Sequence, residues 1–207
     1  MVFEVIVVGP LSVNCLVLGC DETREGVVVD PGGDVESIIQ AVRRHGLNIR
    51  YIINTHGHFD HVGGNRQAVA AFGAPLLIHQ ADAPMFERVA DVGRMYGIPC
   101  ENSPPADGFL TEGMEIGFGG SSMKVLHTPG HTPGGCCLYL AKENKVITGD
   151  TLFADSIGRT DLPGGSHDQL LASIRGKLFT LPDDVIVYPG HGPETTISHE
   201  KRHNPYF

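Results

Sequence analysis

The chain has 207 residues, of which 41% are hydrophobic and 19% charged, a composition typical of an ordered globular protein that excludes a disordered one. No stretch approaches the roughly 20 consecutive apolar residues of a membrane span, and the first ten residues show no secretion signal. A formal net charge of −9 without a long basic run disfavours nucleic acid and anionic lipid as partners. We therefore expect a cytoplasmic protein in which residues 1–207 form a single domain.

The five cysteines are predicted to be reduced thiols. Their number is odd, so disulfides within the chain would leave at least one of them unpaired. Cys136 and Cys137 are neighbours in an apolar run, and successive side chains of a strand point to opposite faces of its sheet. We therefore expect these two thiols to point apart rather than to bond each other.

Short apolar runs separated by Gly, Pro and Asn turns open the chain. Their β-branched residues predict strands, at Val2–Val8, Cys15–Leu18 and Val27–Val29. Apolar residues then recur at helical spacing from Val35 to Val42 and stop before Gly46, a residue suited to the end of a helix. A further strand is predicted at Arg50–Ile53, and it runs directly into a cluster of histidines.

The remaining elements are predicted in the same way, except that Gly93–Gly120 has no clear pattern. Helices are expected over Asn65–Phe72 and Ala81–Val92, and strands at Leu76–Ile78, Met123–Leu126, Cys136–Leu140, Val146–Thr148 and Val185–Val187. Ser166 and Gln169 form a capping box for a helix whose apolar stripe runs from Leu170 to Leu178. Two sheets packed face to face with helices outside would accommodate this order of elements.

Four side chains able to bind a metal lie within six residues, at His56, His58, Asp60 and His61. If this loop is extended, alternation sends His56, His58 and Asp60 to one side. Imidazole nitrogens and carboxylate oxygens suit zinc or ferrous iron. The adjacent pair Asp60 and His61 cannot readily face the ion that His56 and His58 face, so the motif favours a second metal.

Supporting ligands are expected from the ends of other strands. His131, Asp150 and His191 each follow a predicted strand and have Gly or Pro beside them, which lets the backbone turn sharply close to a metal. A carboxylate such as Asp150 can also bridge two cations, which a histidine cannot do.

These motifs resemble those of the metallo-β-lactamase superfamily, whose His-x-His-x-Asp-His motif is matched in full by His56–His61. Within this superfamily, the residues of these motifs are similar to those of the hydroxyacylglutathione hydrolases, the glyoxalase II group, and of their short bacterial relatives. The resemblance implies an α+β fold, a four-layer αβ/βα sandwich. It also implies two metal sites, with His56, His58 and His131 on one metal, Asp60, His61 and His191 on the other, Asp150 bridging them and Asp30 bracing the site.

The same resemblance implies hydrolysis of a small-molecule thioester such as S-D-lactoylglutathione by a metal-bridging hydroxide, which Asp60 and Asp150 orient. Zinc is the expected metal, and the ligand set also accepts iron or manganese. Arg159 stands nine residues after Asp150, where glyoxalase II enzymes carry a basic residue that contacts the glutathione carboxylate. An ion pair of Arg159 with Asp155 or Asp161 is the structural alternative.

Two departures from the larger glyoxalase II enzymes leave the glutathione specificity open. Only sixteen residues follow His191, which leaves no room for their helical substrate-binding domain, and Pro193 stands where they place a tyrosine.

Other activities remain as alternatives. A mononuclear iron persulfide dioxygenase shares a segment like Gly158–Asp161, and a lactonase is a runner-up of the same hydrolase class. A lactamase is disfavoured, because there is no export signal and Asp150 stands where several lactamases place a cysteine. A non-catalytic metal-binding protein would hold metal without turning over any ester. Among the other histidines, His127 is the candidate for a bracing role, because it lies four residues before His131.

Overall fold

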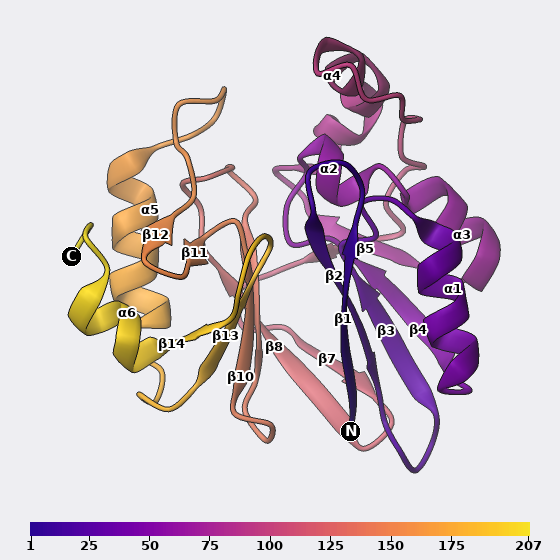
Figure 1. Ribbon diagram of the computed structural model, residues 1–207, viewed down its shortest axis with the longest axis horizontal. Coiled ribbons are helices and arrows are strands. Elements are labelled where there is room, and N and C mark those ends of the chain that lie inside the picture. The colour runs from indigo at the N-terminus through magenta and orange to yellow at the C-terminus, as the bar shows by residue number, and fades with distance from the viewer.

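The computed structural model describes residues 1–207 and places two β-sheets face to face, with helices on both outer faces (Figure 1). This is the four-layer αβ/βα arrangement that the sequence predicted. Apolar residues alternate or run continuously along the strands, so each sheet buries one face against the other sheet and one face against helices. No helix combines the length and the apolarity that crossing a bilayer would require.

The first sheet has six strands that follow chain order from one edge to the other. They are β1 (Val2–Val8), β2 (Val13–Gly19), β3 (Glu25–Val29), β4 (Asn48–Ile53), β5 (Leu76–His79) and β6 (Gly108–Leu110). The first three pair antiparallel, whereas β3 to β6 pair parallel through helical crossovers. The carboxyl ends of β3, β4 and β5 therefore meet at the same edge of the sheet.

The second sheet also has six strands, in the order β14-β13-β10-β9-β8-β7. They are β7 (Glu115–Phe118), β8 (Ser121–His127), β9 (Cys136–Leu140), β10 (Lys145–Gly149), β13 (Ile186–Pro189) and β14 (Thr195–Thr196). Only β10 and β13 pair parallel. A separate hairpin, β11 (Leu152–Phe153) with β12 (Ser156–Ile157), follows β10.

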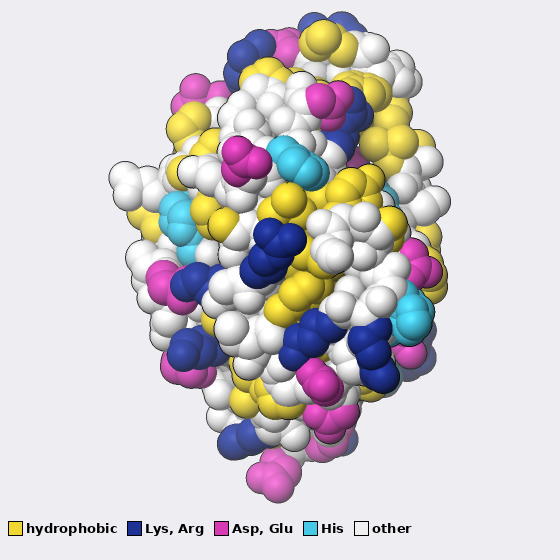
Figure 2. Space-filling view, turned by 90° about the vertical axis from the view of Figure 1, so that its left-hand side faces the viewer, with side chains coloured by type: hydrophobic (Ala, Val, Ile, Leu, Met, Phe, Trp, Pro, Cys, Tyr) yellow, Lys and Arg dark blue, Asp and Glu magenta, His cyan; other side chains and the backbone are white.

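The helices divide between the two outer faces (Figure 1). On the first sheet lie α1 (Val35–Arg44), α2 (Phe59–Val62), α3 (Asn65–Phe72), the 3₁₀-helix η1 (Ala83–Arg88) and α4 (Val89–Met95). On the second sheet lie α5 (His167–Ser173), its π-helical continuation η2 (Ile174–Leu178) and α6 (Ile197–His203). The face that carries α5 and α6 shows basic and acidic side chains interspersed, without one continuous patch of either sign (Figure 2).

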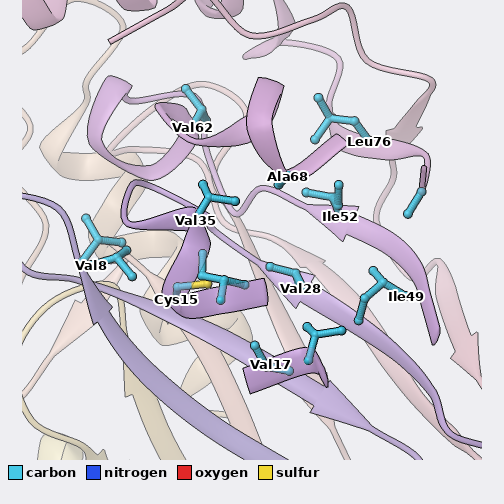
Figure 3. Close-up of a cluster of buried hydrophobic side chains, with 14 of the residues drawn as sticks. Val8, Cys15, Val17, Val28, Val35, Ile49, Ile52, Val62, Ala68 and Leu76 are labelled. Atoms are coloured by element: carbon cyan, nitrogen blue, oxygen red, sulfur yellow. The ribbon is translucent and has the colours of Figure 1, made fainter. Parts of the chain in front are cut away.

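Three clusters of buried side chains correspond to the three contacts between the layers. The first joins strands of the first sheet to α1 and α3, and Figure 3 shows Val28 and Ile52 facing Val35 and Ala68 within it. The second lies between the sheets, and the third lies between the second sheet and α5 and α6. Cys136 belongs to the second cluster and Cys137 to the third. Both thiols are free and point apart, as alternation along the strand predicted.

Two local predictions need correction. The helix expected over Ala81–Val92 starts later, with the 3₁₀ turn η1, and α4 extends it to Met95; Pro84 lacks an N–H and so favours the start of a helix over its interior. The histidine loop is not extended throughout, because α2 begins at Phe59. Asp60 therefore does not share the direction of His56 and His58 through strand-like alternation.

Candidate metal centre

The predicted ligands follow the ends of strands in both sheets. His56 and His58 lie on the loop after β4, and Asp60 and His61 lie in the short helix α2 that continues it. From the second sheet come His131 after β8, Asp150 after β10 and His191 after β13. All seven side chains predicted as ligands meet in one place, at the edge where the two sheets face each other.

His56, His58 and His131 form the first group of potential ligands, with one ring nitrogen from each within 4.8 Å of the others. Nε2 of His131 lies 2.8 Å from Nδ1 of His58. Nε2 of His56 is buried and has no hydrogen-bond partner. Three imidazoles thus direct nitrogens into one small space.

Asp60, His61 and His191 form the second group. Nε2 of His191 lies 3.3 Å from Oδ2 of Asp60 and 3.2 Å from Nε2 of His61. Asp60 and His61 lie in α2, where the chain leaves the extended conformation of His58, and both contact His191.

Asp150 lies between the two groups. Its Oδ1 is 3.4 Å from Nε2 of His61, and its Oδ2 is 3.6 Å from Nε2 of His131 and 3.7 Å from Nε2 of His191. Burial raises the pKa of Asp150, but His61, His131 and His191 outweigh burial and hold that pKa far below its usual value. A charged carboxylate therefore faces both groups.

The donor atoms fit divalent metal ions. Buried polar atoms almost always have partners, yet Nε2 of His56 and Oδ1 of Asp150 have none in the protein. Two ligands bound at 2.0–2.2 Å to one ion lie about 3–3.5 Å apart, a spacing close to the contacts of 3.2 and 3.3 Å that His191 makes in the second group. Nitrogen and oxygen donors without thiolate match zinc, iron or manganese.

Four of the five ligand histidines are held through their other ring nitrogen. The pairs are His56 Nδ1 with Thr55 Oγ1 at 3.1 Å, His61 Nδ1 with Asp30 Oδ2 at 3.0 Å, His131 Nδ1 with the Arg159 carbonyl at 2.8 Å and His191 Nδ1 with the Leu11 carbonyl at 2.9 Å. Such contacts fix the ring orientation and leave Nε2 free for a metal.

Asp30 lies beside the ligands rather than among them. Its carboxylate accepts hydrogen bonds from the Thr55 backbone N–H at 2.8 Å and the Thr55 hydroxyl at 2.6 Å, in addition to its contact with His61. Its backbone has a φ of 51°, a left-handed conformation that Asp tolerates better than most residues. Asp30 therefore connects Thr55 to the ring of His61.

The two groups differ in charge preference. Burial, reinforced by neighbouring histidines, holds the pKa of His56 well below its usual range and lowers the pKa of His58 to about 4. Burial also acts to lower the pKa of His61 and of His191. Asp150 and Asp30 outweigh burial at His61, and Asp60 and Asp150 outweigh it at His191, so that both pKa values are raised. His56 and His58 are therefore neutral at pH 7, whereas the carboxylates around His61 and His191 favour positive charge on these two rings.

A sequence model described as the metallo-beta-lactamase superfamily matches residues 8–191, a span that contains both groups of ligands and Asp150. The chain belongs to this superfamily. Its members are metal-dependent hydrolases that bind divalent metals, and the fold described above is theirs.

Three proteins of known name or structure resemble this superfamily member over nearly its whole length. The hydroxyacylglutathione hydrolase GloC of Haemophilus influenzae is 38% identical over 208 residues, covering 100% of this chain and 98% of GloC. The crystal structure of the B3 metallo-β-lactamase BLEG-1 is 42% identical with a TM-score of 0.92 and covers 99% of both chains. The structure of TTHA1623 in a di-iron-bound form is 37% identical with a TM-score of 0.91, covering 99% of this chain and 100% of TTHA1623.

Arg159 occupies a different position from the ligands. Its side chain is exposed and forms two hydrogen bonds with Asp161, of 2.7 and 2.8 Å, so the structural alternative named above is present with Asp161. Asp155 instead contacts His199 at 2.7 Å. The carbonyl of Arg159 accepts from His131, so this segment borders the first group of ligands.

A cavity of about 520 Å³ lies beside Asp60. The turn between β1 and β2, the start of α3 and the segment 98–101 form its walls, and its polar side chains include Asp34, Arg66, Gln67 and Glu101. Its size is in the range of small-molecule binding sites. The superfamily site therefore has room next to it for part of a substrate.

The sequence interpretation missed one carboxylate at this site. Asp82 is fully buried in the turn after β5 and contacts the loops of His56 and His131. The available signal was its place: like Asp30 and Asp150, it is an acidic residue just beyond the end of a strand. The backbone carbonyls of Leu11 and Arg159, which accept from His191 and His131, could not be predicted from sequence, because any residue can supply a backbone carbonyl.

Proposed function

We propose that this superfamily member is a binuclear hydrolase that cleaves a thioester such as S-D-lactoylglutathione. The observation that carries the proposal is the position of Asp150, whose two oxygens face two separate groups of ligands. The similarity to the hydroxyacylglutathione hydrolase GloC over the full chain supports the choice of substrate. Residues 1–207 would act as a single domain.

In this proposal His56, His58 and His131 would hold one metal, Asp60, His61 and His191 would hold the other, and Asp150, which lies between the two groups, would contribute to both sites. Two bound divalent cations act as Lewis acids and lower the pKa of water to about 7, so that hydroxide is available at neutral pH. Zinc is the proposed metal. The di-iron form of TTHA1623 supports iron as the other candidate, and the ligand set also accepts manganese.

The residues of the chain position the reactants. Asp60 and Asp150 are nearly buried, and their carboxylate oxygens can accept a hydrogen bond from the attacking water and so fix its orientation. Two free thiols lie nearby, Cys136 beside the predicted ligands and Cys100 in the wall of the cavity, and burial raises the pKa of both above the usual value, which disfavours either as nucleophile. A thioester suits such a site, because its thiolate leaves without a strong acid to protonate it.

Arg159 is the proposed contact for a substrate carboxylate. Its guanidinium already binds the Asp161 carboxylate through two parallel hydrogen bonds, which is the geometry it would use for a substrate. Exposed ion pairs of this kind contribute only about 0–1 kcal/mol, so exchange of Asp161 for a substrate carboxylate costs little.

The test is an assay of the metal-reconstituted protein with S-D-lactoylglutathione. Arg159→Ala should raise KM about tenfold and change kcat little, because it removes binding that is the same in the ground and transition states. Arg50→Ala is the matched control: Arg50 is exposed to a similar degree and paired with Glu25, but it lies near the start of β4, away from the ligands. Absence of thioester cleavage by the fully metallated protein would refute the proposal.

Two further assays distinguish the other candidates. The similarity to the lactamase BLEG-1 favours β-lactam hydrolysis as a second activity of the same site, and a chromogenic β-lactam tests it directly. Oxygen consumption with glutathione persulfide tests the dioxygenase alternative. We expect the thioester to be the preferred substrate of the three.

A further inference from the structure

Asp82 joins the two loops that carry the first group of ligands. Its Oδ2 accepts a hydrogen bond of 3.0 Å from the backbone N–H of Gly57, and its Oδ1 accepts one of 2.7 Å from the backbone N–H of Gly134. Gly57 lies between His56 and His58, and Gly134 lies three residues after His131. One fully buried carboxylate therefore connects a loop from each sheet.

Both loops approach Asp82 more closely than a side chain would permit. A Cβ atom on Gly134 would lie 2.7 Å from Cγ of Asp82, and one on Gly57 would lie 3.0 Å from the Asp82 carbonyl oxygen. Real Cβ atoms rarely come so near to other atoms, so glycine at both positions allows the two short hydrogen bonds to form.

The turn that carries Asp82 is itself fixed. The backbone N–H of Asp82 donates to the His79 carbonyl at 3.0 Å, and its carbonyl accepts from Met85 at 2.9 Å as η1 begins. Phe86 of η1 is buried and anchors the turn in the first core cluster. On the other side of the His131 loop, Nε2 of His127 donates to the Pro133 carbonyl at 3.0 Å. His127 therefore contacts the loop that carries His131.

We infer that Asp82 is a positioning residue for the metal bound by His56, His58 and His131. It touches none of the ligand nitrogens, but it sets the separation between the loops from which they project. The inference rests on the metal assignments of the proposed function and not on the substrate. Asp82 contacts no loop that carries a ligand of the second group. We therefore expect its substitution to weaken metal binding at the first site only.

Asp82→Asn tests this inference, since the amide keeps the shape of the carboxylate but has one oxygen. Its NH₂ group would face one of the two backbone N–H donors, and one loop would lose its hydrogen bond. Zinc affinity should be measured by competition with a chromophoric chelator in two backgrounds. His191→Ala leaves the first site to be measured, and His58→Ala leaves the second.

We expect Asp82→Asn to weaken zinc binding about 10–100-fold in the His191→Ala background, the usual effect of losing a group that orients ligands. Binding in the His58→Ala background should change less than about threefold. Hydrogen exchange in the metal-free protein gives a readout independent of metal, because the amide of Gly57 or Gly134 should exchange faster. Glu200→Gln is the control: Glu200 is equally buried and accepts from the Asp155 backbone and Asn204, but contacts no ligand loop.

Gly134→Ala provides a second variant if Asp82→Asn fails to fold, since it keeps the carboxylate and pushes the His131 loop away from it. Equal losses in both backgrounds, or unchanged affinity at the first site, would overturn the inference. A protein that binds both zinc ions but cleaves no thioester would refute the proposed function and leave the role of Asp82 intact.

Discussion

Individual side chains at this site either point into the space between the two groups of predicted ligands or hold one another in place. Asp30 shows the division most clearly, since its carboxylate accepts from Thr55 and from Nδ1 of His61 and so fixes Nε2 of His61 toward the site. The motif His56–His61 indicated candidate ligands because these residues are close together in sequence. Asp82 was not predicted, because it binds backbone N–H groups, and such contacts produce no pattern in the residue types around it.

The first residue-scale prediction concerns Asp30. Asp30→Asn would place an amide donor against donors from Thr55 or His61, and zinc affinity at the second site should fall about 10–100-fold. Isothermal titration of the metal-free variant measures this. Asp34→Asn is the matched control, because Asp34 also has a positive φ and accepts one backbone N–H, from Gly9, but contacts no ligand. Equal losses in both variants would contradict the bracing role.

The second residue-scale prediction concerns the pH dependence of the contact between Glu4 of β1 and the end of α1. Burial raises the pKa of Glu4, but hydrogen bonds from His45 and Arg44 outweigh it, and the pKa lies below its usual value. These contacts of Glu4 therefore stabilise the fold above about pH 4.5, the usual pKa of a glutamate, and this contribution is lost as pH falls through the lower folded-state pKa.

Glu4→Gln should accordingly lower Tm by about 1–3 °C at pH 7, as expected for a pair worth at most about 1 kcal/mol in a protein of this size. The difference from the wild type should shrink at pH 3.5. Differential scanning calorimetry across this range measures both values, with Glu87→Gln as a control at an exposed glutamate that has no ion pair in the structure. A difference that grows on acidification would refute the assignment.

At the scale of elements, strand ends and sharp turns bring the ligands together. The strands that lead to them were predicted from apolar runs, because burial on both faces gives a strong sequence signal. The short helix α2 and the 3₁₀ turn η1 were not, since one turn of helix contains too few residues to show a period. Their shape depends on contacts with distant loops, which local sequence does not encode.

Gly190 gives the element-scale prediction. It follows β13, and a Cβ atom there would lie 2.2 Å from Oδ1 of Asp150 and 2.7 Å from Cε1 of His61. Backbone hydrogen bonds with Asn14 and Gly149 hold Gly190 in place, so the ligands must move instead. Gly190→Ala should therefore reduce kcat about 100-fold or more, as a misplacement of about 1 Å does.

The control for Gly190→Ala is Gly176→Ala, because a Cβ atom on Gly176 would enter open space. That variant should keep its metal content and its kcat. Full activity in Gly190→Ala would show that the loop after β13 tolerates more movement than its contacts suggest.

For the whole molecule, the site exists only when the two sheets are packed together. The first sheet supplies Asp60 and three histidines, and the second supplies His131, Asp150 and His191. The order of elements was compatible with two packed sheets, and the family resemblance implied the four layers, but neither predicted which strands are neighbours. β6 and β7 were absent from the prediction, because strands of three and four residues in a polar region give almost no pattern.

This arrangement predicts that metal stabilises the fold, since the unfolded chain has no preformed site. Each ion present at 100 times its Kd adds about 2.7 kcal/mol, so removal of metal with EDTA should lower Tm by roughly 5–20 °C for a chain of this length. Thermal unfolding with and without EDTA measures the shift. A double variant, His131→Ala with His191→Ala, should lose most of it, whereas an unchanged EDTA effect in that variant would place the stabilising metal elsewhere.

The central claim is that two metals act together through Asp150, and a titration of metal-free protein with zinc tests it most directly. Hydrolysis of S-D-lactoylglutathione should stay low during the first equivalent of zinc per chain and rise to its maximum only as the second binds. Full hydrolysis with one equivalent, or no hydrolysis with two while one iron per chain supports oxygen uptake with glutathione persulfide, would contradict the claim.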